Sequence, residues 1–305
     1  MPSSIITSGS FAKALWPGVN KWWGDSYAEY PLLYPRIFAE DSSDKGYEED
    51  VQSTGFGLLT QKPESTSINY DSAMQGYTYR YTHITYALGF QVTREAMMDD
   101  QYMVIAKKRS KALGFSTRQT QEVIAWNVLN RAFNSTYAYG DGKELIATDH
   151  PNFTGGTFSN ELTVAADLSE LAIEQLLIQM MGAQDDRGLI INLMPRSLIV
   201  ANSNTFEATR ILKSNLQNDT ANNATNAMRE MGLFADGIIT SPYLTDPDAW
   251  FIKSNCPDGL KYFMREAPSV SEDNDFDTTN AKFKTYFRAS WGATDPRGIW
   301  GSAGG

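Results

Sequence analysis

Residues 62–102 read KPESTSINYDSAMQGYTYRYTHITYALGFQVTREAMMDDQY, and the rest of the architecture can be inferred outward from this stretch. Alternation with a period of two places three rings on one face of a β-strand, those of Tyr77, Tyr79 and Tyr81. The preceding limb, around Phe56 and Leu58, is expected to pair with that strand across a polar tip that contains Lys62. The pattern therefore predicts a long hairpin over residues 47–92. Its tyrosine face needs a cover, because a two-stranded ribbon is marginal alone in water.

The residues before this hairpin are unusually aromatic. Within the first 46 residues lie Trp16, Trp22, Trp23, Tyr27, Tyr30, Tyr34 and Phe38. Pro17, Gly18, Pro31 and Pro35 interrupt the same segment, so we expect an irregular arm and not one long helix. So many rings need a surface to pack on, either that of the same chain or that of a neighbour.

The residues after the hairpin turn helical. Apolar residues recur every three or four positions over 97–133, which predicts two helices or one bent helix around Gly114. A further helix is expected from Asp167, whose side chain can cap it, to a point before Gly188. Between them, the turn Asp141–Gly142 suggests a strand or hairpin.

Residues 189–265 read as a separate α/β unit. LIINLMP and SLIVA are strand-like, helical stretches follow near 204–214 and 222–231, and three more strand-like runs come next. The last two of these are joined by the turn sequence NCPDG. After an acidic loop, the C-terminal residues give one more alternating strand and a glycine-rich end.

Charge and composition exclude several classes of protein. The chain has 305 residues, 42% of them hydrophobic, with 26 Lys and Arg against 36 Asp and Glu, a net charge of −10. Nucleic-acid binding through phosphates usually needs a basic excess, and the short basic cluster Lys107–Arg109 is more typical of a solvated helix face. The single cysteine excludes a disulfide framework. No apolar run is long enough for a membrane span, and no secretory signal is visible.

Signatures of catalysis and metal binding are weak. Two histidines and one cysteine do not readily build a metal site, and no phosphate-binding loop or nucleophile elbow occurs. Asp149–His150 is expected to be a turn before Pro151. In the loop with Asp273, Asp275 and Asp277, a calcium site would need Gly and Glu where Thr278 and Lys284 stand. We therefore expect no enzyme, no cofactor and no metal.

The stretch quoted above resembles the extended-loop region of the major capsid proteins of tailed bacteriophages, those with the Hong Kong 97-like fold. Four further segments are similar to the same family in the same order. They are the aromatic arm, the helix that closes with VLNRAF, the run GLIINLMPRSLIVANSNTFEATRIL, and the terminal FKTYFRASWGATDPRGIWGS.

This resemblance implies an α+β fold with four parts: an N-terminal arm at 1–46, an extended β-hairpin loop at 47–92, a peripheral domain with a long spine helix at 93–187 and 266–305, and an axial α/β domain at 188–265. It also implies hexamers and pentamers that close into an icosahedral shell around double-stranded DNA, without sequence-specific contact. The protein is then expected in the virion, assembled in the host bacterial cytoplasm, with no membrane. A portal protein, a decoration protein and a separate scaffold protein are the expected partners.

In such a shell, aromatic and Arg side chains are the expected assembly contacts. The candidates are Trp22, Trp23, Lys62, Tyr77, Tyr79, Arg80 and Tyr81. Tyr79→Ala is expected to impair shell formation while the subunit stays folded. Some members of the family crosslink a Lys to an Asn with the help of a Glu. Lys62 is near the loop tip, but the sequence identifies no partners for it, so no crosslink is predicted.

Three alternatives remain open at this point. An encapsulin-like compartment would use the same fold to enclose cargo proteins. A small-molecule-binding module could be built on residues 189–265. An enzyme would have to use Asp149 and His150, or the carboxylates of 271–277, and the sequence offers no supporting nucleophile.

Overall fold

The computed structural model describes residues 9–93, 102–217, 224–274 and 280–305. The helices and 3-10 turns are α1 (Gly9–Glu29), η1 (Tyr34–Arg36), α3 (Tyr102–Asn130), α4 (Glu170–Met181), η2 (Asn202–Asn204), α5 (Thr205–Lys213), α6 (Ala227–Met231) and η3 (Pro296–Gly298). The strands are β1 (Ala39–Ser42), β2 (Tyr47–Ser53), β3 (Gln75–Thr82), β4 (Ile84–Val92), β5 (His150–Pro151), β6 (Thr157–Phe158), β7 (Pro195–Ala201), β8 (Gly237–Ser241), β9 (Trp250–Ser254), β10 (Leu260–Asn274), β11 (Ala281–Ala293) and β12 (Ile299–Ser302).

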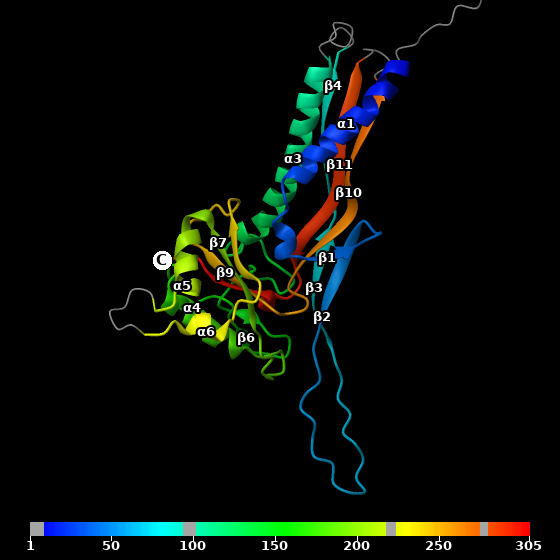
Figure 1. The fold of residues 1–305 in the computed structure, drawn as a ribbon. Helices are drawn as coiled ribbons and strands as arrows, with labels where there is room; N and C mark the ends of the chain where they lie inside the picture. Colours follow the sequence, from blue (N-terminus) through cyan, green and yellow to red (C-terminus); the bar gives the residue numbers. More distant parts are fainter. Residues whose placement is uncertain (1–8, 94–101, 218–223, 275–279) are drawn as a thin grey trace, which may run out of the picture.

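The described residues form two four-stranded sheets and two small ribbons. The long sheet has the order β1-β10-β11-β4, and the second sheet has the order β12-β9-β7-β8. Figure 1 shows α1 and α3 alongside the long sheet, the unit built on the second sheet to one side, and the segment between β2 and β3 running away from both. Helices and strands are thus mixed, as the α+β expectation requires.

The arm contains one long helix, so the prediction that its prolines forbid such a helix is wrong. Helix α1 continues through Pro17, although proline removes one backbone hydrogen bond and costs about 3 kcal/mol in a helix interior. Contacts with α3 oppose this cost. The Ser110 hydroxyl donates to the Val19 carbonyl at 2.7 Å, and the Ser26 hydroxyl donates to the Lys111 carbonyl at 2.9 Å. Tertiary contacts therefore override the local signal.

Helix α3 is a single element of 29 residues with no break at Gly114. At 1.5 Å per residue it is about 43 Å long. Gly114 faces α1, and a Cβ atom there would lie 2.7 Å from the Trp23 carbonyl oxygen. The glycine thus marks the crossing of two helices and not an interruption of one.

Helix α4 begins slightly later than predicted. Its N-cap is Ser169, whose hydroxyl accepts from the Ala172 amide at 3.2 Å. Asp167, the predicted cap, instead accepts from the Gly305 amide at 3.0 Å. The helix ends at Met181, well before Gly188.

The predicted turn at Asp141–Gly142 is confirmed, but no strand surrounds it. Gly142 adopts a φ of 81°, and its amide donates to the Tyr139 carbonyl at 3.0 Å. Positive φ is a region that glycine enters without steric cost, which explains its position here.

The 47–92 segment divides differently from the predicted hairpin. Strands β2 and β3 do pair, from Tyr47 opposite Thr82 onward. Phe56 and Leu58 lie beyond this ladder and belong to no strand. After β3 the chain enters β4, which pairs with β11 in the long sheet. The segment is therefore a short ribbon, an irregular loop and a sheet strand.

The sheet pairing also differs from the expected division at residues 265 and 266. Strand β10 runs unbroken across that boundary within the long sheet. Strand β12, expected with the peripheral part, pairs with β9 in the second sheet instead. In the predicted run LIINLMP only an isolated bridge at Ile190 forms, and regular structure starts at Pro195. The last strands of the chain thus tie both units together.

One hydrophobic core joins the long sheet and its helix α3 to the α/β unit built on the second sheet. Trp126 and Leu129 from α3 pack with Phe287 from β11 and Phe251 from β9. A second core lies within the α/β unit and includes Ile173 of α4. Burial of such side chains is the main source of stability in folded chains.

Candidate functional site

The segment between β2 and β3, residues 54–74, is called the extended loop here. Its backbone bonds are few: Thr54 and Met74 join its ends, and Thr66 donates to Pro63 near the tip. Large apolar side chains are nonetheless exposed along it, namely Phe56 (63% exposed), Leu58 (80%), Leu59 (100%), Ile68 (56%) and Tyr70 (88%). Figure 1 shows its two limbs reaching past every other labelled element. Exposed apolar groups gathered in this way are typical of an interaction surface.

One carboxylate joins the two limbs of the extended loop near its root. Asp71 Oδ2 accepts from the Gly57 amide at 2.8 Å and from Arg187 Nη1 at 2.6 Å. Arg187 Nη2 also donates to the Ser72 carbonyl. The hydrogen bond from Gly57, followed by that from Arg187, lowers the pKa of Asp71 to about 2. The carboxylate is therefore charged at any pH near neutrality.

Arg187 extends from a tight turn that precedes β7. The Asp185 carboxylate accepts from the backbone amides of Arg187 and Leu189, both at 2.8 Å. Gly188 adopts a φ of 81°, which a side chain would oppose. This turn fixes the backbone from which the Arg187 side chain extends.

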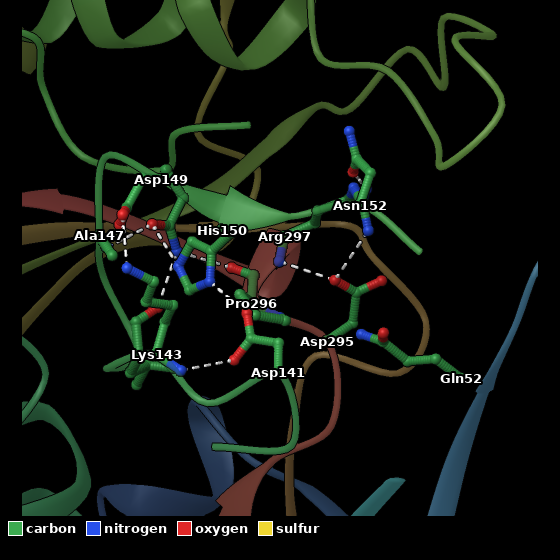
Figure 2. Close-up of polar contacts among 12 residues, drawn as sticks. Gln52, Asp141, Lys143, Ala147, Asp149, His150, Asn152, Asp295, Pro296 and Arg297 are labelled. Carbon is green, nitrogen blue, oxygen red and sulfur yellow. Dashed lines mark hydrogen bonds and ion pairs between the residues drawn. The ribbon is translucent and has the colours of Figure 1, made fainter. Parts of the chain in front are cut away.

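A buried arginine fixes the same turn to the C-terminal strands. Arg297 is only 5% exposed, and its guanidinium donates to the Gln184 carbonyl and to the Asp186 carboxylate at 3.2 and 3.1 Å. It also donates to Asn152 Oδ1 at 2.9 Å and lies over the Phe158 ring at 4.1 Å. Figure 2 shows this arginine between Asn152 and Asp295. Planar, multiply bonded guanidinium groups hold several segments in fixed geometry.

A second buried polar group lies beside it in Figure 2. His150 Nδ1 is 2.6 Å from Asp141 Oδ2, and His150 Nε2 is 3.1 Å from Asn160 Oδ1. The Asn160 amide nitrogen donates to the carbonyls of Leu145, Pro296 and Ile299 at 2.8 to 3.0 Å. These bonds tie the segment after α3 to the C-terminal strands.

This geometry argues against the Asp149–His150 enzyme. His150 is fully buried and lies in the short strand β5, not in the predicted turn. Asp149 faces away from it and pairs with Lys143, and Figure 2 shows this separation. A catalytic base must reach a substrate, and His150 is sealed among side chains of its own chain.

The predicted tyrosine face is confirmed, and its cover is the same chain. Tyr79 stacks on Tyr139 with ring centroids 5.0 Å apart, and Tyr81 packs on Phe263 at 4.8 Å. The third ring predicted on that face, Tyr77, contacts Phe153 edge to face, with ring centroids 6.0 Å apart.

Of the other candidate contacts, two belong to α1 and two are exposed elsewhere, in β3 and at the loop tip. Trp22 and Trp23 belong to α1, where Trp23 is buried against Tyr27. Arg80 is exposed, with Glu49 at 3.1 Å and the Tyr47 ring beneath its guanidinium. Lys62 is exposed at the tip of the extended loop. The structure brings Tyr77, Tyr79 and Tyr81 together and leaves Lys62 apart from them.

Sequence reasoning missed Asp71, Arg187, Arg297 and Asn160. The run DDRG has the Asp and Gly spacing of a turn, which could have located Arg187 in one. Its partner lies 116 residues away, and no local pattern identifies such a pair.

Asp275 and Asp277 of the acidic loop lie outside the described residues. Within the described ranges, no group of His, Cys, Asp and Glu side chains has an arrangement suited to a metal ion. No helix in that part of the chain is long and apolar enough to cross a membrane.

Solved structures share this fold over most of the chain. A virus-like particle from Pyrococcus furiosus has 11% identity and a TM-score of 0.55, covering 93% of this chain and 97% of its own. The procapsid of bacteriophage JBD30 has 15% identity and a TM-score of 0.55, covering 97% and 76%. The capsid of an empty GTA particle has 12% identity and a TM-score of 0.58, covering 90% of each chain. No curated protein sequence matches the chain.

The described residues thus combine an exposed apolar loop with a base in which His150 is sealed from solvent. The profile of the family described as phage capsid protein matches residues 76–302, and the chain belongs to that family. It is therefore a shell-forming capsid protein and not an enzyme. The family match also favours a phage capsid over the encapsulin-like alternative.

Proposed function

We propose that copies of this chain form hexamers and pentamers that close into an icosahedral shell around double-stranded DNA, in the manner of the Hong Kong 97-like fold. The observation that carries this proposal is the extended loop. The five large apolar side chains named above are exposed on a segment that extends away from the rest of the subunit. A second copy that covers them removes apolar surface from water, which favours association.

The expected division into arm, extended loop, peripheral and axial parts becomes a proposal with two adjustments. Residues 260–265 go with the peripheral part because they belong to β10. Residues 299–302 go with the axial part because β12 pairs with β9. Helix α3 is the proposed spine helix.

The energetics of a closed shell suit modest contacts. Each subunit makes several contacts, and closure makes them act together, so no single contact has to be strong. The net charge of −10 suits a container whose inner wall must not hold the DNA packed against it. Lys62, Arg80 and the aromatic residues Trp22, Trp23, Tyr77, Tyr79 and Tyr81 stay in the proposal as contacts with neighbours or as supports for them.

The proposed partners are further copies of this chain, a separate scaffold protein, a portal protein and a decoration protein. The shell is part of the virion, and its proposed place of assembly is the host cytoplasm. Packaged DNA is enclosed without sequence-specific contact.

The test is a pair of variants within the extended loop. Leu59→Glu places a charge on a fully exposed apolar position, and Thr60→Glu places the same charge on its polar neighbour. Both subunits are expected to fold with unchanged thermal midpoints, because surface substitutions rarely alter stability. Electron microscopy is expected to show at least tenfold fewer shells for Leu59→Glu and a much smaller loss for Thr60→Glu. Equal shell yields for Leu59→Glu and the parent chain would contradict the proposal.

A further inference from the structure

We propose that Asp71 and Arg187 form a latch that sets the direction of the extended loop, so that its apolar tip meets the neighbouring subunit. The inference rests on the proposed function and names the residues that position its contact surface. Asp71 and Arg187 are thus positioning residues for assembly, although neither belongs to the exposed apolar set.

The first step is that Asp71 holds both limbs together. Its carboxylate accepts from the Gly57 amide on one limb and from the Ser72 amide on the other, both at 2.8 Å. A Cβ atom on Gly57 would lie 3.4 Å from Asp71 Oδ2, so the limbs are close at this point. The loop therefore has a defined root.

The second step is that Arg187 connects this root to the body of the subunit. Its Nη1 lies 2.6 Å from Asp71 Oδ2, and its Nη2 donates to the Ser72 carbonyl. The turn that carries Arg187 is capped by Asp185 and bonded to the buried guanidinium of Arg297. The root of the extended loop is thus bonded to a turn that the buried Arg297 fixes in place.

The extended loop reaches far beyond the latch. Residues 58–70 lie beyond the latch, and six or seven extended residues per limb reach about 20 Å at 3.3 Å per residue. A rotation of about 20° at the root then moves the tip by about 7 Å. Apolar side chains touch only within about 4.5 Å, so this displacement breaks every contact at the tip.

The Asp71–Arg187 pair is expected to matter little for the stability of the subunit. The Asp71 side chain is 47% exposed and that of Arg187 is 18% exposed, and solvent screening at the Asp71 end keeps the contribution of this pair to the free energy of folding modest. Removing the latch is therefore expected to leave the subunit folded, but the extended loop then adopts a range of orientations relative to it. This separates a positioning role from a structural one.

The first experiment measures the latch in the subunit itself. Spin labels at Thr60→Cys in the loop and Thr209→Cys on α5, in a Cys256→Ser background, give a distance distribution. We expect a narrow distribution in the parent chain and a broad one in Asp71→Arg and in Arg187→Asp. Arg187→Lys keeps a cation within reach of Asp71 and leaves the Asp71 bonds to the Gly57 and Ser72 amides untouched, so its distance distribution is expected to stay narrower than that of either charge-reversal variant. Asp71→Asn, which keeps the side-chain shape, provides a milder break.

A matched control breaks an exposed ion pair elsewhere. Arg196 and Asp236 lie 3.1 Å apart on the α/β unit, and Asp236→Arg is expected to leave the loop distribution unchanged. A narrow distribution in both charge-reversal variants, Asp71→Arg and Arg187→Asp, overturns the proposal.

The second experiment counts shells for the same variants by electron microscopy. We expect at least a tenfold loss for each charge-reversal variant and a yield within threefold of the parent for Arg187→Lys. Parent-like yields from the charge-reversal variants overturn the assembly role. If the parent chain forms no shells either alone or when expressed with the neighbouring genes of its genome, the proposed function fails, and the distance distributions still decide whether the latch exists.

Discussion

Gly114 of α3 lies directly against the Trp23 carbonyl of α1, since a Cβ atom on the glycine would be 2.7 Å from that oxygen. The backbones of the two long helices are in close contact at this point. The Arg118 side chain then donates to the Tyr27 carbonyl, and its guanidinium lies 3.8 Å from the centre of the Tyr27 ring. The aromatic arm is thus part of the folded subunit and not a free tail.

Gly114→Ala is expected to destabilise the subunit by about 1–3 kcal/mol, because overpacking forces the helices apart. Gly24 on α1 is the matched control, since a Cβ atom there meets nothing within 4 Å. Gly24→Ala is expected to stabilise the subunit by about 0.5–1 kcal/mol through helix propensity. Urea unfolding followed by tryptophan fluorescence measures both. Equal effects of the two substitutions would show that the helices do not cross at Gly114.

Glu122 of α3 holds the chain that follows α1. Its Oε1 accepts from the Leu33 amide at 2.5 Å, and its Oε2 accepts from Trp126 Nε1 at 2.8 Å. Glu122→Gln turns one acceptor into a donor, so one buried N–H loses its partner, at a cost of about 1–3 kcal/mol. The unfolding free energy at constant pH measures this loss, and an unchanged value would be incompatible with the two bonds.

The same residue predicts a pH dependence. Burial raises the pKa of Glu122 above its ordinary value of 4.5, so the folded chain keeps this proton where the unfolded chain has lost it. Its contribution to stability is fully present below pH 4.5 and is lost as pH rises through the raised pKa. Urea titrations from pH 4.5 to 7 are expected to show the parent losing stability relative to Glu122→Gln. A difference that stays constant or changes in the opposite direction contradicts this assignment.

Cys256 is predicted to be a poorly reactive thiol. Burial, followed by the charge of Asp295, raises its pKa to about 12. At pH 8 the folded chain is expected to react with a thiol reagent at least a hundredfold more slowly than the chain unfolded in guanidinium chloride. Equal rates in the two states would place the thiol at the surface.

Tyr79 packs within its own subunit, in addition to its proposed contact with a neighbouring subunit. Its ring stacks on Tyr139 and meets Tyr81 edge to face, and Gly292 lies beneath it with no room for a Cβ atom. Tyr79→Ala is therefore expected to cost about 2 kcal/mol of subunit stability, somewhat less than truncation of a fully buried ring, because Tyr79 is half-buried. Tyr79→Phe keeps the ring and is expected to change stability by less than about 0.5 kcal/mol.

These two variants test the expectation that the Tyr79→Ala subunit stays folded, and they measure how much stability the ring contributes. Thermal unfolding of the isolated subunits is the measurement. A Tyr79→Ala subunit as stable as the parent would show that the ring packs against a neighbour and not within its own chain.

Local patterns in the sequence predicted the elements that have one buried face. The period of two in β3 places Tyr79 and Tyr81 on one side, and the period near 3.6 identifies α3. Such periods report which face is buried, but they do not name what covers it. The sequence left open whether the tyrosines pack within the chain or on a neighbour for this reason.

The remaining features depend on contacts between distant residues. Helix α1 passes through Pro17 because α3 supports it, and β12 joins β9 by pairing that no local propensity encodes. The Asp71–Arg187 pair has the same origin, as its members lie 116 residues apart. A single sequence carries no signal for such pairs.

Assembly is the central claim, and electron microscopy of the purified parent chain tests it most directly. The chain should be imaged alone and after expression with the neighbouring genes of its genome, so that a scaffold protein is supplied if one is needed. We predict closed shells or capsomer rings. A uniform monomer under both conditions would contradict the account.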